Sequence, residues 1–138
     1  MSSYLTFYLV PKGEDKKPLT FISYSRNNDV YQSYNKELSP AYIGNGDNPN
    51  YTELTPEKAL QVVNAAKEDL KKAERALNSR ISAYKELNNT SEEAIQDITD
   101  TREYIEELKE GLNELQCIYN WVSDIKYSDF EKVLINID

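Results

Sequence analysis

The sequence predicts an α+β protein. We expect a long antiparallel hairpin of two helices, coiled-coil-like, with a small N-terminal module containing a β-hairpin docked at its open end. Two long heptad-like stretches flank a polar turn at residues 88–90, and two aromatic, β-branched runs lie near the N-terminus. Composition changes near Leu54, which divides the chain into a Tyr-rich module, residues 1–54, and a helical hairpin with a short tail, residues 55–138.

The N-terminal module begins with two predicted strands at residues 4–10 and 19–25. Both are short apolar runs rich in aromatic and β-branched side chains, and turn-forming residues such as Gly13 and Pro18 separate them. This arrangement is typical of a β-hairpin. Because a lone β-hairpin is only marginally stable in water, we expect it to dock on the rest of the chain.

A short helix is predicted next, at residues 28–38. The spacing of its apolar residues gives it one apolar face: Val30, Tyr31, Tyr34 and Leu38. Residues 40–50 are expected to form a loop with a tight turn at residues 44–47. Residues 51–54 are then expected to pair briefly with residues 41–43.

The first long helix has a clear start. Thr55 is a favourable N-cap, Pro56 suits the first helical position, and Glu57 favours the positive end of the helix dipole. Its apolar residues follow a heptad register in which Arg80 is the one charged misfit, and the neighbouring Ile81 could take that heptad position instead. The register contains Ala59, Val63, Ala66, Leu70, Ala73, Leu77, Arg80, Tyr84 and Leu87.

The second long helix is predicted to start at a capping box, with Thr90 as N-cap and Glu93 three residues later. Gly111 lies in mid-helix, where glycine is unfavourable, and indicates a close contact. The heptad register contains Ala94, Ile98, Thr101, Ile105, Leu108, Leu112, Leu115, Tyr119 and Val122.

Extra apolar residues lie outside the heptad positions at the end far from the turn. They are Leu60, Val62, Ile118, Trp121 and Ile125. This second apolar surface predicts that the N-terminal module docks there, with the turn projecting into solvent.

The tail at residues 130–137 has two interpretations. Val133, Ile135 and Ile137 recur at every second position, which favours a strand added to the N-terminal hairpin. Asp129 could instead cap a last helical turn. We favour the strand.

The formal net charge of −8 argues against direct binding to nucleic acid or to an anionic membrane, and favours a basic protein partner. The charge is uneven. Residues 56–88 hold seven Lys/Arg and five Asp/Glu, a charge of +2, whereas residues 91–127 hold three and ten, a charge of −7. This difference favours pairing of the two helices over self-pairing of the second.

Two groups of side chains are candidate partner-binding residues. One is an acidic row on the second helix, whose spacing of three and four places it on one face: Asp97, Asp100, Glu103, Glu107 and Glu110. The other is a set of tyrosines suited to an interface: Tyr31, Tyr34 and Tyr42. The alternatives are a solvated helix face and a tyrosine-rich core.

Catalytic and metal sites are not indicated. The chain has no histidine, and the oxygen-rich residues 44–50 lack the alternating acids of a calcium loop. Cys117, the one cysteine, lies beside the heptad positions and is expected to be a buried structural thiol. A single cysteine also fits a reducing compartment. The sequence therefore predicts a cytoplasmic protein, in a host or infected cell, without cofactor, metal or enzymatic activity.

The predicted function is protein–protein interaction or assembly without catalysis, as a homo-oligomer, in a style typical of a phage or mobile element. The alternative is an acidic inhibitor of a nucleic-acid-binding protein, of counter-defence type. A small-ligand site at the Tyr-rich loop is a third hypothesis.

Overall fold

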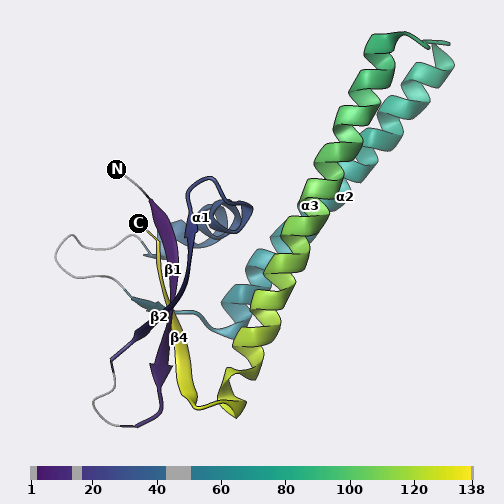
Figure 1. Ribbon diagram of the computed structural model, residues 1–138. Coiled ribbons are helices and arrows are strands. Elements are labelled where there is room, and N and C mark those ends of the chain that lie inside the picture. The colour runs from purple at the N-terminus through teal and green to yellow at the C-terminus, as the bar shows by residue number, and fades with distance from the viewer. Residues whose placement is uncertain (1–2, 14–16, 43–50, 138) are drawn as a thin grey trace.

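The computed structural model describes residues 3–13, 17–42 and 51–137, with only the backbone described for residues 39–42. Its α+β architecture confirms the predicted fold class (Figure 1). The elements are β1 (Tyr4–Pro11), β2 (Leu19–Ser25), α1 (Asp29–Tyr42), β3 (Thr52–Glu53), α2 (Pro56–Glu86), α3 (Glu92–Asp124), a 3-10 turn η1 (Ile125–Tyr127) and β4 (Phe130–Ile137).

The strands form one antiparallel sheet in the order β2-β1-β4-β3. The predicted β-hairpin is confirmed as β1 and β2, and the tail is a strand. Alternate residues of β4 face the core, with Ile135 opposite Phe7 and Val133 opposite Leu9. The C-terminal strand β4 therefore lies inside the sheet, between β1 and β3. The division near Leu54 stays a prediction.

The expected pairing of residues 51–54 with 41–43 is wrong. Residues 41 and 42 belong to α1, which extends four residues beyond the predicted end of the helix at Leu38, and residue 43 lies outside the described residues. Thr52 instead lies opposite Ile135 of β4, and the backbone N–H of Leu54 donates to the carbonyl of Val133 at 2.9 Å. Backbone N–H groups of residues 52–54 thus donate to carbonyls of β4 and are not free to pair with residues 41–43.

The two long helices pack antiparallel and project away from the sheet as an arm (Figure 1). Burial along the outer arm is confined to a few heptad residues such as Ala94 and Ile105, while Val62, Ile118 and Val122 are also buried at the base. The narrow outer contact and broad apolar base are as predicted. Leu87 is an exception: α2 ends at Glu86, and Leu87 is 75% exposed. No described helix is long and apolar enough to cross a membrane.

The helix caps agree with the prediction at α2 but not at α3. Thr55 caps α2, accepting a hydrogen bond from the Lys58 N–H at 3.3 Å. At α3 the N-cap is Ser91, not Thr90, because the Ser91 Oγ accepts from the Ala94 N–H at 3.2 Å. The Asn89 Oδ1 accepts from the Ser91 N–H at 3.0 Å. The helix therefore starts one residue later than the predicted capping box implied.

Ser91→Ala is expected to speed amide exchange in the first turns of α3 by about fivefold, because losing an N-cap costs about 1 kcal/mol. Hydrogen exchange is the appropriate measurement, since the end of the arm can open locally without global unfolding. Thr90→Ala is the matched control, and its exchange should stay near wild type. Faster exchange in Thr90→Ala than in Ser91→Ala would restore Thr90 as the cap.

One core joins the sheet to α1 and the base of the arm, which lie on the same side of the sheet (Figure 1). Phe7 is central: its ring lies edge-on to those of Tyr24, Tyr34 and Trp121, at centroid distances of 5.9, 5.6 and 6.3 Å. Docking of the N-terminal module at the open end of the helical hairpin is thus confirmed.

Candidate functional site

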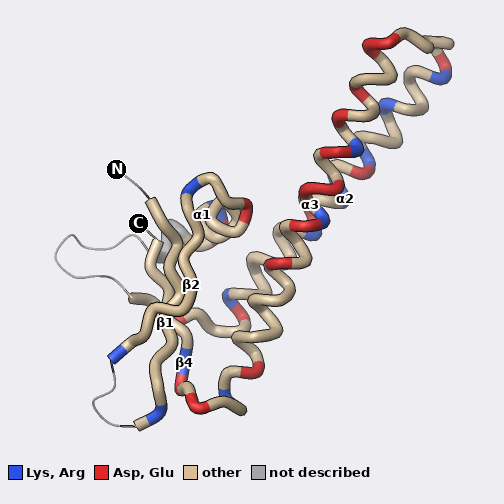
Figure 2. Tube along the Cα trace, viewed as in Figure 1, with Lys and Arg blue, Asp and Glu red and all other residues tan. Residues whose placement is uncertain are grey.

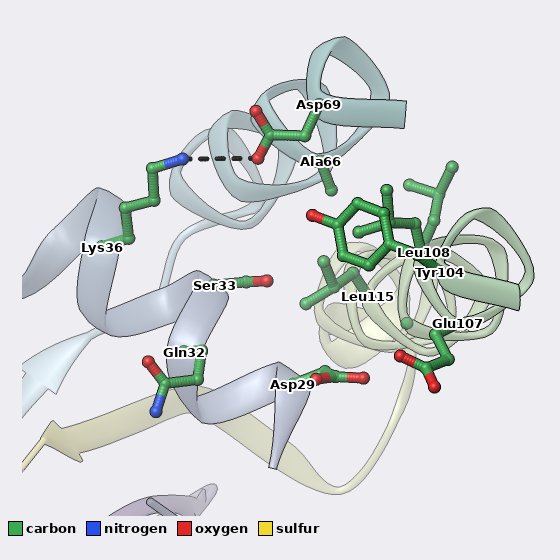
Figure 3. Close-up of a pocket in the computed structure, with 12 residues that line it drawn as sticks. Asp29, Gln32, Ser33, Lys36, Ala66, Asp69, Tyr104, Glu107, Leu108 and Leu115 are labelled. Atoms are coloured by element: carbon green, nitrogen blue, oxygen red, sulfur yellow. Dashed lines mark hydrogen bonds and ion pairs between the residues drawn. The ribbon is translucent and has the colours of Figure 1, made fainter. Parts of the chain in front are cut away.

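A cleft of about 420 Å³ lies where α1 meets the two long helices (Figure 3). From α1 come Asp29, Ser33 and Lys36, whereas α2 supplies Asp69. Its apolar lining consists of Ala66, Leu108, Leu112 and Leu115, with the ring of Tyr104 beside them. The cleft exists because α1 packs against the base of the arm at an angle and leaves the outer part of that junction open.

The charged residues that line the cleft are mostly acidic. Asp29, Asp69 and Glu107 contribute carboxylates, against the single ammonium group of Lys36. Lys36 Nζ pairs with Asp69 Oδ2 at 3.3 Å and so joins α1 to α2. Asp29 points towards α3, on the side where Glu107 lies (Figure 3). Acid groups around an apolar lining are suited to a lysine or arginine side chain, whose stem is apolar and whose end is charged.

Gly111 also lines this cleft and faces Asp29. A Cβ added there would stand 3.6 Å from the Asp29 Cβ, which is an ordinary van der Waals distance. The glycine marks the approach of α1 to α3, yet the approach does not require a glycine.

The predicted acidic row is largely exposed along α3. Figure 2 shows acidic residues recurring along α3. Asp100, Glu103, Glu107 and Glu110 are all exposed, and Glu107 also lines the cleft. Asp100 accepts a hydrogen bond from Gln96 Nε2 at 2.7 Å on the same helix. These four residues, which we call the α3 acidic face, form one continuous surface with the cleft.

Asp97 contacts α2 instead. Its Oδ1 lies 3.3 Å from Arg80 Nη1, and its Oδ2 accepts from the Tyr84 hydroxyl at 2.8 Å. Arg80 also donates to Thr101 Oγ1 at 2.7 Å. The hydrogen bond to Asp97, with a smaller contribution from desolvation, raises the pKa of Tyr84. The heptad misfit Arg80 is therefore part of a polar contact that joins the two helices.

The tyrosines predicted as an interface lie elsewhere. Tyr31 and Tyr34 are only 6% and 0% exposed, so they pack in the core, which is the alternative that the sequence left open. The side chain of Tyr42 lies outside the described residues, as does the loop considered for a small ligand.

A second depression, of about 300 Å³, lies between β2 and α3. Phe7, Phe21, Ile22, Ile118 and Trp121 supply its apolar lining. We call this depression the β2 groove.

Cys117 also lines the β2 groove and is exposed, so the expectation of a buried thiol is wrong. The reason is the sheet's width: β2 is its last strand on this side, and no further described strand covers this part of α3. Tyr24 borders the groove beside Glu114. Burial, together with a hydrogen bond to Glu114, raises the pKa of Tyr24 to about 12.

Comparison with protein-family models, curated proteins and solved structures found no match to this chain. The site residues missed by sequence reasoning are Asp29, Lys36, Asp69 and Tyr104. They come from three helices far apart in the sequence, and only the docking of α1 brings them together. The acidic pattern of α3 could identify just one wall of the cleft.

Proposed function

We propose that this chain is a non-enzymatic protein–protein interaction or assembly protein that binds a basic protein through the α3 acidic face and the adjoining cleft. The observation that carries the proposal is the continuity of the two features, because Glu107 belongs to both. Basic side chains along a partner's surface would pair with the exposed carboxylates. One of them would place its apolar stem against Leu108 and Leu115.

The setting of this function is part of the proposal. A cytoplasmic location, in a host or infected cell, is supported by the single cysteine, and an origin in a phage or mobile element by the general composition. Self-assembly into a homo-oligomer is also proposed, because a stiff arm fixed to a small sheet leaves separate surfaces for a copy and for a partner.

The test is affinity capture from the native host with the immobilised chain. A triple variant, Asp100→Lys, Glu103→Lys and Glu107→Lys, should lose the basic partner, with binding weakened at least about tenfold. The matched control reverses three exposed acids of α2, Glu68→Lys, Glu74→Lys and Glu86→Lys, which changes net charge equally. This control should retain the partner. Recovery of the same partner by both variants would contradict the proposal.

A second function, inhibition of a nucleic-acid-binding protein, is favoured by the acidic residues that recur along α3 (Figure 2). Regularly spaced carboxylates can imitate the charge of a phosphate backbone. The same capture separates the two functions. Duplex DNA added as a competitor should displace a nucleic-acid-binding partner, whereas a partner bound elsewhere on its surface should remain on the column.

A further inference from the structure

The outer edge of β2 has no neighbouring strand among the described residues. The opposite edge of the sheet is β3, which has only two residues, whereas β2 has seven. An edge strand presents a row of backbone N–H and C=O groups that readily pair with another strand. Of the two edges, β2 is therefore the one long enough to accept a partner strand.

The side chains of β2 favour such pairing. Residues 18–25 contain no charged residue, and Leu19 and Phe21 are 53% and 54% exposed. Proteins that stay monomeric commonly protect an edge with charges, a very short strand or a bulge. The irregular register at Phe21 is the one such feature of β2, because the strand has seven residues and none of them is charged.

The β2 groove adds apolar surface beside this edge. Phe21 is stacked on Trp121, with ring centroids 4.9 Å apart and an interplanar angle of 24°, and Ile22 lies next to them. A strand added at β2 would lie along the open side of this groove. Its side chains would then bury part of the exposed ring of Phe21.

We infer that β2 pairs antiparallel with β2 of a second copy of this chain, about a twofold axis near Ile22, which joins two four-stranded sheets into one. A twofold contact requires a self-complementary surface. In the register centred on Ile22, Phe21 lies opposite Ser23, and Thr20 opposite Tyr24. No charged side chain lies within the paired segment.

Charge favours a second copy at this edge. The net charge of −8 makes copies repel one another, and the acidic residues are concentrated on the arm (Figure 2). The residues of β2 itself carry no charge, so pairing of two copies along this strand brings no like charges of the strand together. Antiparallel pairing brings Lys17 of one copy towards Arg26 of the other, and these two positive charges repel. Glu114 of the other copy lies at the same end of the paired strands, and its negative charge offsets this repulsion.

This inference rests on the assembly part of the proposed function and is independent of the basic partner. A chain that fails to dimerise could still bind a basic protein through the α3 acidic face. Conversely, a dimer formed through β2 leaves that face exposed. The two proposals can therefore fail separately.

The test is light scattering after size-exclusion chromatography of the full chain over a range of concentrations. We expect a concentration-dependent dimer. Leu19→Lys and Phe21→Lys should each raise its dissociation constant at least about tenfold, because each places a charge at the paired edge. Ile95→Lys is the matched control: it replaces another exposed apolar residue, 59% exposed and far out on α3, and should leave the dimer unchanged.

Two variants are used because Phe21 also stacks on Trp121, while Leu19 lies at the start of the strand. A chain that is strictly monomeric at about 100 μM would overturn the inference. So would a dimer that persists unchanged in the folded Leu19→Lys and Phe21→Lys variants, or one that only Ile95→Lys dissociates.

Discussion

Phe7→Ala is expected to lower the free energy of unfolding by about 3–5 kcal/mol, the usual cost of truncating a buried phenylalanine. Phe7 is fully buried, and its ring contacts the rings of Tyr24, Tyr34 and Trp121, which come from three other elements. The cavity left by the ring would border β2, α1 and α3 at once, so no single element can move to fill it. The measurement is urea denaturation followed by circular dichroism.

The matched control is Tyr127→Ala, which removes an aromatic ring that is 79% exposed. It should change the free energy of unfolding by no more than about 0.5 kcal/mol. A protein of this size is stabilised by only about 5–15 kcal/mol, so the loss at Phe7 is a large fraction of the total. If both variants unfold at the same urea concentration, Phe7 does not join the sheet to the helices as described.

The parts of the fold that sequence predicted correctly are those with a strong local pattern. Alternation identified β4 through Val133 and Ile135, and heptad spacing identified both long helices. The docking surface was also predictable, because Val62 and Ile118 are apolar residues outside the heptad positions. Such residues need a partner other than the opposite helix.

The errors arose where specific contacts, which the residue pattern does not encode, decide the outcome. Thr90 and Ser91 are adjacent N-cap residues of similar quality, and the structure has the hydrogen bonds from the Ser91 N–H to Asn89 and from the Ala94 N–H to Ser91. Burial of Cys117 depends on whether the sheet extends beyond β2, which no property of α3 encodes. The cleft is a similar case, since Asp29 and Asp69 line one cleft only when α1 docks.

The last strand provides the sharpest test of the sheet, and Ile135→Asp should cost several kcal/mol, on the order of 3–5. Ile135 is fully buried opposite Phe7, so an aspartate there places a charge in an apolar core without a partner. Unfolding in urea, monitored by Trp121 fluorescence, would report the loss directly, because Trp121 packs on Phe7.

Asn136→Asp is the control because it introduces the same side chain one residue later, on the opposite face of β4 and paired with Thr6. Its cost should stay below about 1 kcal/mol, since a partly exposed carboxylate keeps much of its hydration. Successive residues of a strand face opposite sides, so a shift of one residue in register would exchange the two effects. A larger loss for Asn136→Asp would therefore mean that β4 pairs with β1 one residue out of the register described, with Asn136 in the core.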